Sequence, residues 1–165
     1  ASLFPNAKFI ISEKEWEYAT TQDDIFVTRE SIEFLKNKDK IMISRDETEI
    51  YPGMKAIFTP GHTPGGMSLI LESGNGKWVL AGDAVKNRIE LSSGKVDMSL
   101  NTKDSQQSIS RIKSIADRVL PGHDCWLKVE GDKVIPEGKV QVEIALPAGM
   151  HGGENGVFKL VVDND

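Results

Sequence analysis

Three polar residues in segments rich in glycine and proline are the strongest candidates for chemistry in this sequence. They are His62 in Thr59-Pro60-Gly61-His62-Thr63-Pro64-Gly65-Gly66, Asp83 in Leu80-Ala81-Gly82-Asp83-Ala84, and His123 in Leu120-Pro121-Gly122-His123-Asp124. Imidazole and carboxylate together are ligands that zinc, iron and manganese favour in proteins. Each residue also has an ordinary alternative, because isolated histidines and aspartates are often simply surface residues of a loop or turn. Residue type and spacing therefore indicate a metal site, and the alternative of three unrelated loop residues stays open.

Two of the candidates lie at the ends of predicted strands. Apolar runs bounded by glycine and proline predict strands at 56–58 and 67–71, with His62 on the loop between them. Asp83 directly follows a third apolar run, which predicts a strand at 78–81. Polar side chains displayed at the ends of stiff elements are typical of functional sites.

The third candidate follows the clearest helical pattern in the chain. Isoleucine, alanine and valine recur at steps of three and four residues over 101–119, which predicts one long helix. Pro121-Gly122 would end this helix, so we expect His123 between a helix and a strand at 126–130.

The remaining elements complete a chain of mixed α and β structure. Ser12 and Glu15 have the spacing of a capping box at the start of a helix. Ser73-Gly74-Asn75-Gly76 is typical of a hairpin turn. The further predicted elements are helices at 13–20 and 30–38, and strands at 9–11, 41–44, 133–135, 140–146 and 157–162.

Composition narrows the class of protein. The 165 residues are 39% hydrophobic and 27% charged, as in folded globular proteins. Twenty Lys and Arg against 25 Asp and Glu give a net charge of −5, which argues against nucleic-acid binding as the main function. No apolar run has the length of a membrane span. Cys125 is the single cysteine, so an internal disulfide and a cysteine-rich zinc site are excluded and a cytoplasmic setting is expected.

Taken together and in this order, the three motifs resemble the C-terminal half of the metallo-β-lactamase superfamily. That half carries an isolated histidine in a Thr-Pro-Gly-His-Thr-Pro-Gly loop, a Gly-Asp after a strand and a Pro-Gly-His near its end. Here the candidates lie 21 and 40 residues apart, and the resemblance covers residues 3–127. It implies an α+β fold that is part of an αβ/βα sandwich of the metallo-β-lactamase type, with extra strands at the C-terminus.

The resemblance also implies roles for the candidates. His62 would bind a first metal ion, His123 a second, and Asp83 would bridge both and take part in catalysis. Zinc is the expected ion, with iron and manganese as alternatives. Because an aspartate stands where antibiotic-destroying lactamases commonly use a cysteine, the similarity is greater to lactonase- and glyoxalase-II-like hydrolases. Such enzymes act by metal-bound hydroxide on an ester, lactone or thioester, so a small-molecule substrate is expected.

One departure from the family pattern shapes the remaining expectations. The signature His-x-His-x-Asp-His, which supplies further metal ligands, does not occur in the sequence. We therefore expect residues 1–128 to form the C-terminal half of the family fold and residues 129–165 to form a tail of strands on the same domain or on a partner. A sheet without its partner sheet exposes apolar area. A second copy of the chain, a separate N-terminal polypeptide or the tail itself would have to cover it, so a homo-oligomer or a two-part assembly is expected.

Two functions remain open at this point, and so do the roles of several other residues. The first function is the metal-dependent hydrolase, and the second is a catalytically silent domain that serves as an oligomerisation or interaction module. His151, with Glu154 three residues later, is either a substitute ligand or an exposed loop histidine. Lys86-Asn87-Arg88 either contacts an anionic substrate or forms a solvated loop. Cys125 is expected to be a small packed side chain.

Overall fold

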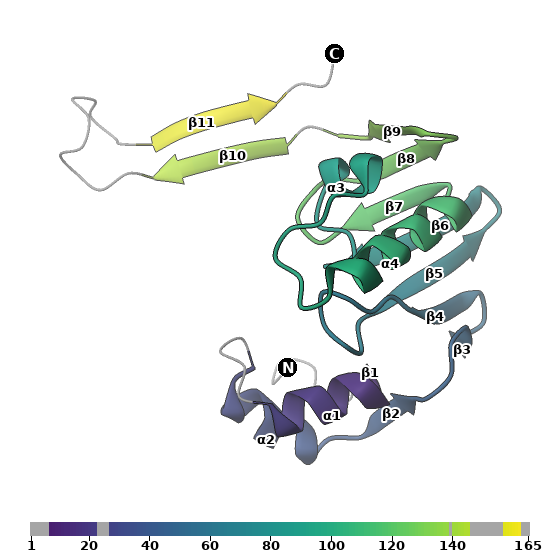
Figure 1. Ribbon diagram of the computed structural model, residues 1–165, viewed down its shortest axis with the longest axis vertical. Coiled ribbons are helices and arrows are strands. Elements are labelled where there is room, and N and C mark those ends of the chain that lie inside the picture. Colours follow the sequence, from purple (N-terminus) through teal and green to yellow (C-terminus); the bar gives the residue numbers. More distant parts are fainter. Residues whose placement is uncertain (1–6, 23–26, 139, 146–156, 163–165) are drawn as a thin grey trace.

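Seven strands form the main sheet of the molecule (Figure 1). The computed structural model describes residues 7–22, 27–138, 140–145 and 157–162. None of the helices in these ranges has the length and apolar character needed to cross a membrane. The strands lie side by side in chain order: β3 (Thr48–Tyr51), β4 (Met54–Phe58), β5 (Met67–Ser73), β6 (Gly76–Gly82), β7 (Arg118–Pro121), β8 (Leu127–Glu130) and β9 (Lys133–Pro136).

The strand directions bring three carboxyl ends to one edge of this sheet. β4, β5 and β6 are antiparallel neighbours, and the predicted hairpin turn joins β5 to β6 with Ser73 opposite Gly76. β6 and β7 are parallel, and their crossover carries the helices α3 (Arg88–Ser93) and α4 (Thr102–Ile115). β4, β6 and β7 therefore all run in the same direction.

The core lies between the main sheet and these two helices, which cover one of its faces (Figure 1). Alternate residues of a strand point to the same face, so Val79 and Ala81 of β6 are both buried there. Val119 of β7 is fully buried beside them. α4 contributes Ile109 and Ile112, which lie on one side of the helix as their spacing predicts.

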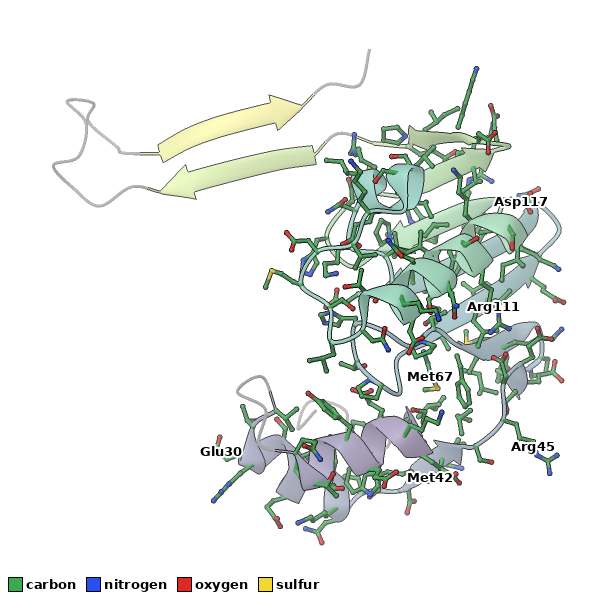
Figure 2. All side chains as sticks on the ribbon, in the orientation of Figure 1. Glu30, Met42, Arg45, Met67, Arg111 and Asp117 are labelled. Carbon is green, nitrogen blue, oxygen red and sulfur yellow. The ribbon has the colours of Figure 1, made fainter. Side chains whose placement is uncertain are left out.

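The opposite face of the main sheet is apolar and half-buried. Leu69, Leu80 and Leu120 are cross-strand neighbours on β5, β6 and β7, and each has intermediate exposure. The same face carries further half-buried apolar side chains, namely Met54, Met67 (labelled in Figure 2), Leu71 and Trp78. Because α3 and α4 lie on the other side, this open face is the surface for which a covering polypeptide was expected.

A smaller N-terminal unit contacts the loop after β4 through two residues at the start of its first helix. It consists of the parallel strands β1 (Phe9–Ser12) and β2 (Lys40–Ile43) and the helices α1 (Glu13–Thr21) and α2 (Arg29–Lys36). Ser12 caps α1 as predicted, because its hydroxyl accepts the N–H of Glu15 at 3.0 Å. The Glu15 carboxylate accepts the N–H of Gly65 at 3.0 Å, and Ser12 donates to the Gly65 carbonyl at 2.6 Å. The capping residues thus attach α1 to the loop that carries His62.

The C-terminal strands form two different structures. β8 and β9 pair at the edge of the main sheet, and Val129 and Val134 pack against the core. The expected boundary between residues 128 and 129 therefore falls inside β8. β10 (Val140–Ala145) and β11 (Val157–Val162) pair antiparallel in a separate two-stranded sheet (Figure 1). His151 and Glu154 lie outside the described residues.

The helix predicted over 101–119 is too long. α4 ends at Ile115 and β7 begins at Arg118, so His123 follows a strand rather than a helix. Val119 continues the helical spacing, yet it pairs with Val79 in the sheet. Asp117 accepts the N–H of Lys77 at 2.7 Å and holds the chain where it leaves the helix. The pairing of β7 with β6 therefore outweighs the helical period of this segment. Two further elements, β3 and α3, have no counterpart among the predicted elements.

Candidate metal centre

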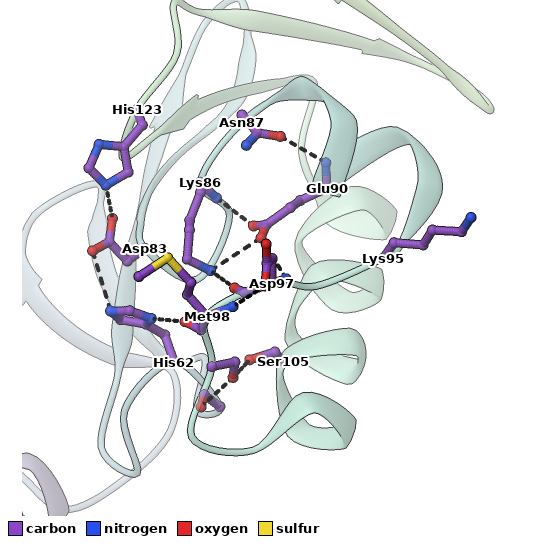
Figure 3. Close-up of polar contacts among 12 residues, drawn as sticks. His62, Asp83, Lys86, Asn87, Glu90, Lys95, Asp97, Met98, Ser105 and His123 are labelled. Carbon is purple, nitrogen blue, oxygen red and sulfur yellow. Dashed lines mark hydrogen bonds and ion pairs between the residues drawn. The ribbon is translucent and has the colours of Figure 1, made fainter.

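His62, Asp83 and His123 meet at the sheet edge where β4, β6 and β7 end (Figure 3). His62 lies on the loop after β4, Asp83 directly follows β6, and His123 lies two residues after β7. Nε2 of His62 is 3.4 Å from Oδ2 of Asp83, and Nε2 of His123 is 3.2 Å from Oδ1. The common direction of the three strands thus brings together side chains that are far apart in the sequence.

Two His–Asp pairs share the carboxylate of Asp83, a donor arrangement that would suit two divalent ions. Each imidazole faces a different oxygen of the carboxylate. Two ligand atoms on one tetrahedral ion, with bonds of about 2.0–2.2 Å, lie about 3.3–3.6 Å apart. Both observed separations are close to that value. Within the described ranges, no group of three or more His, Cys, Asp or Glu residues is arranged to hold a metal ion, and the three candidates form two His–Asp pairs.

The orientation of His62 is set by a carbonyl on the far side of its ring. Nδ1 of His62 lies 3.1 Å from the carbonyl oxygen of Met98. A carbonyl only accepts, so this bond forms when Nδ1 carries a proton, and in a neutral ring of that tautomer Nε2 would have its lone pair available to a metal ion. The loop itself is anchored because the Gly61 carbonyl accepts bonds from the Ser99 hydroxyl at 2.7 Å and the Asn101 N–H at 2.9 Å.

A glycine allows the segment that carries His123 to approach Asp83. The N–H of Gly122 donates to the carbonyls of Gly82 and Val85, both at 3.0 Å. A Cβ atom at position 122 would lie 2.2 Å from Oδ1 of Asp83. Glycine is therefore required by space at this position of the Pro-Gly-His motif.

His123 is held by its backbone and by its neighbour. Its N–H donates to the carbonyl of Lys86 at 2.8 Å. Asp124 forms a bidentate pair with Arg88, with Nε–Oδ2 at 2.8 Å and Nη2–Oδ1 at 2.7 Å. The Arg88 guanidinium holds the pKa of Asp124 well below its usual range. The backbone is thus fixed, while the His123 side chain is 67% exposed.

An open hollow of about 340 Å³ lies beside the candidate ligands. His62 and Asp83 line one part of it, and Thr59, Met67 and Ala81 line another. It therefore offers both polar and apolar surface next to the paired side chains.

The charged segment 86–88 is a structural part of the site rather than a solvated loop. Lys86 pairs with Glu90 at 3.2 Å, and the Asn87 side chain caps α3. Arg88 is engaged with Asp124, as described above. Cys125 packs against the core as expected, and burial raises the pKa of its thiol.

Two residues that support the site, Glu90 and Met98, are absent from the predicted set. A usable signal existed for the first, because the Asn-x-x-Glu spacing of Asn87 and Glu90 marks a helix start, and Gly94 marks its end. Met98 has an unusual backbone φ of 49°, but its residue type gives no indication of that conformation. Its contact with His62 depends entirely on the tertiary fold.

A family model described as the metallo-beta-lactamase superfamily matches residues 2–123, which include all three candidate ligands. This chain belongs to the metallo-β-lactamase superfamily, as its motifs indicate. The α+β fold expected from the resemblance is confirmed by its solved relatives.

Several of the proteins that this chain resembles are lactone hydrolases. An N-acyl homoserine lactonase of Bacillus cereus is 30% identical over 139 residues, or 81% of this chain and 53% of that protein. An N-acyl homoserine lactone hydrolase, solved with the product N-hexanoyl-L-homoserine at its catalytic metal center, is 26% identical with a TM-score of 0.63, over 74% of this chain and 49% of that one. A dizinc quorum-quenching lactonase shares the fold at 18% identity and a TM-score of 0.63, over 82% and 56%. The chain spans about half the length of the curated relatives it matches.

Proposed function

We propose that this chain supplies metal ligands to a metal-dependent hydrolase that acts on lactones or related esters. His62 would bind one ion, His123 a second, and Asp83 both. The observation that carries the proposal is that two imidazoles face different oxygens of one carboxylate, at 3.4 and 3.2 Å. The similarity to N-acyl homoserine lactone hydrolases supports a small lactone as the substrate. Zinc suits a donor set of imidazole and carboxylate.

The chain's own residues would position the reacting groups. A pair of zinc ions held here would supply a hydroxide nucleophile near neutral pH and polarise the substrate carbonyl. Asp83 offers one oxygen toward each imidazole, and the Met98 carbonyl orients the His62 ring so that Nε2 faces Asp83. The hollow beside His62 and Asp83 has a volume within the range of small-molecule sites and would receive the lactone.

The proposal includes a second polypeptide segment that completes the site. A tetrahedral zinc ion takes four ligands, and each His–Asp pair provides two. The open apolar face of the main sheet, around Leu69, Leu80 and Leu120, gives such a segment a surface on which to pack. A separate N-terminal half or a second copy of the chain would fill this role.

Zinc titration tests the ligand assignment. The 165-residue chain should bind zinc, and His62→Ala and His123→Ala should each lower the affinity by about tenfold or more, because each removes one of two donors from a pair. Circular dichroism would establish that each variant is folded. Folded variants that bind zinc as tightly as the parent chain would refute the assignment.

A catalytically silent interaction module remains the second candidate, and the open apolar face is the observation that favours it. The two functions differ when the chain is mixed with the N-terminal portion of the Bacillus cereus lactonase and assayed for ring opening of N-hexanoyl-homoserine lactone. The hydrolase proposal expects turnover that disappears with His123→Ala. A stable, zinc-free complex without turnover would instead support the interaction module.

A further inference from the structure

Glu90 is a buried carboxylate close to the candidate metal centre that takes no direct part in it. The residue is 5% exposed, on α3. Its Oε2 accepts the backbone N–H of Lys86 at 2.8 Å, and its Oε1 accepts Nζ of Lys86 at 3.2 Å and the N–H of Asp97 at 3.3 Å. A buried carboxylate that collects three donors from two separate segments fixes the position of both.

The segment that contains Asp97 leads to His62 (Figure 3). Glu90 holds the N–H of Asp97, and Nζ of Lys86 holds the carbonyl of Asp97 at 2.7 Å. Both sides of one residue's backbone are thus fixed, immediately before Met98. Met98 has a positive φ of 49°, which is uncommon for a residue with a side chain and persists where surrounding contacts impose it. This conformation aims the Met98 carbonyl at Nδ1 of His62.

The segment that contains Lys86 leads to His123. Glu90 fixes the N–H of Lys86, and the carbonyl of the same residue accepts the N–H of His123 at 2.8 Å. Lys86 is itself three residues after Asp83. One carboxylate is therefore connected, through one intervening residue on one side and two on the other, to both candidate histidine ligands.

We propose that Glu90, acting with Lys86, is a positioning residue that sets the orientation of the His62 ring and the placement of His123. The proposal rests on the proposed function for its purpose, but the positioning itself is a property of this chain alone. Hydrogen-bond partners behind metal-binding histidines fix ring orientation and raise ligand basicity, and their loss costs about 10- to 100-fold in metal affinity.

Nitrogen-15 NMR of the histidine rings tests the positioning without metal. The chain has three histidines, so the His62 signals can be assigned by comparison with His62→Ala. In the parent chain, the Nδ1 signal of His62 should show the hydrogen bond to the Met98 carbonyl. Glu90→Gln replaces one acceptor oxygen with a donor amide, which disrupts the contacts with Lys86 and Asp97, and the Nδ1 signal of His62 should move because its bond to Met98 is weakened or lost.

Zinc affinity provides the second readout and a matched control. Glu90→Gln should weaken zinc binding by about 10- to 100-fold. Glu33→Gln removes a Glu–Lys ion pair of 2.6 Å, between Glu33 and Lys36 on the surface of α2, and should leave both the His62 Nδ1 signal and the affinity unchanged. A folded Glu90→Gln chain with the parent's His62 signals and zinc affinity would overturn the proposal.

Met98→Pro tests the proposed positioning of His62 if Glu90→Gln does not fold. The Met98 side chain is 74% exposed, so the change removes little packing, but proline cannot adopt a positive φ. The His62 Nδ1 signal should move in this variant, and an unchanged signal would contradict the proposed connection. If the parent chain binds no zinc at all, the proposed function fails, while the NMR measurement still reports on the positioning.

Discussion

At the scale of single residues, the site depends on one carboxylate that faces two imidazoles. Oδ2 of Asp83 is directed to His62 and Oδ1 to His123, so neither oxygen is redundant. The motifs predicted these three residues as ligands from their types and order. Which oxygen faces which ring could not be read from the sequence, because it depends on the relative placement of two loops.

The first residue-scale prediction concerns Asp83→Asn. The amide keeps the size of the side chain but leaves one acceptor oxygen instead of two, so only one of the two pairs can persist. Zinc affinity should fall by at least about tenfold, whereas the denaturation midpoint should change little because the side chain is 40% exposed. Asp132→Asn, in an exposed turn, is the control and should change neither quantity. Unaltered zinc binding in folded Asp83→Asn would exclude the shared-carboxylate role.

The second concerns Gly65, where α1 meets the His62 loop. An added Cβ would lie 2.0 Å from the backbone nitrogen of Glu15 and 2.4 Å from the Ser12 hydroxyl. Gly65→Ala should therefore lower the free energy of unfolding by about 1–3 kcal/mol, as overpacking does. Gly74→Ala, where a Cβ meets nothing within 4 Å, is the matched control. Equal urea denaturation curves for the two variants would show that α1 is not docked on this loop.

At the scale of elements, an ion pair joins α4 to the segment before β3, and both of its partners also contact the end of β4, which leads into the His62 loop. Arg111 of α4 contacts Asp46 at 2.7 Å and the Phe58 carbonyl at 3.1 Å. Asp46 in turn accepts the N–H of Phe58 at 2.7 Å. Burial by itself raises the pKa of Asp46, but the Phe58 N–H and the Arg111 guanidinium outweigh burial and hold it below the ordinary value of 3.8.

This depressed pKa predicts how stability responds to acid. The folded carboxylate resists protonation, so its stabilising contribution is complete above pH 3.8 and is lost as the pH falls through the lower pKa of the folded state. Asp46→Asn should cost about 0.5–1 kcal/mol at neutral pH, a modest value because the pair is partly exposed. Chemical denaturation at several pH values should show the gap between parent and variant closing in strong acid. A gap independent of pH would contradict the ion pair.

The elements also show where local patterns stop being sufficient. Most predicted helices and strands lie within a few residues of the observed ones, because period and turn residues act locally. The end of α4 is the instructive error. Val119 fits the helical period, but it pairs with Val79 in the sheet, and no short window of sequence contains that partner. A similar limit applies to Met98, whose role depends on His62, 36 residues away.

At the scale of the whole molecule, the main sheet has one covered face and one open face. Adjacent residues of β5 illustrate the contrast, because Ile70 lies in the core at 7% exposure and Leu69 is half-buried on the other side. A broad apolar face of this kind favours association with another polypeptide.

The chain by itself should therefore self-associate. A charged residue introduced on the open face of the main sheet should have a different effect from one introduced on the covered face. Leu69→Glu should reduce the sedimentation coefficient of the associated species with little change in stability. Ile70→Glu should unfold the chain, because it buries a carboxylate without a partner in the core. A well-folded monomer for the parent chain would count against the inference that this face is an interface.

The sequence by itself predicted the residues of the candidate site and determined most of the local elements. Imidazole and carboxylate groups in Gly- and Pro-rich motifs, in family order, indicate the kind of ligand, and side-chain periodicity specifies helices and strands. Tertiary structure alone decided that β4, β6 and β7 end at the same edge, that each histidine meets its own oxygen of Asp83, and that Glu90 supports both. The physical reason is that strand direction and hydrogen-bond partners are relations between distant segments, which no local pattern of residues encodes.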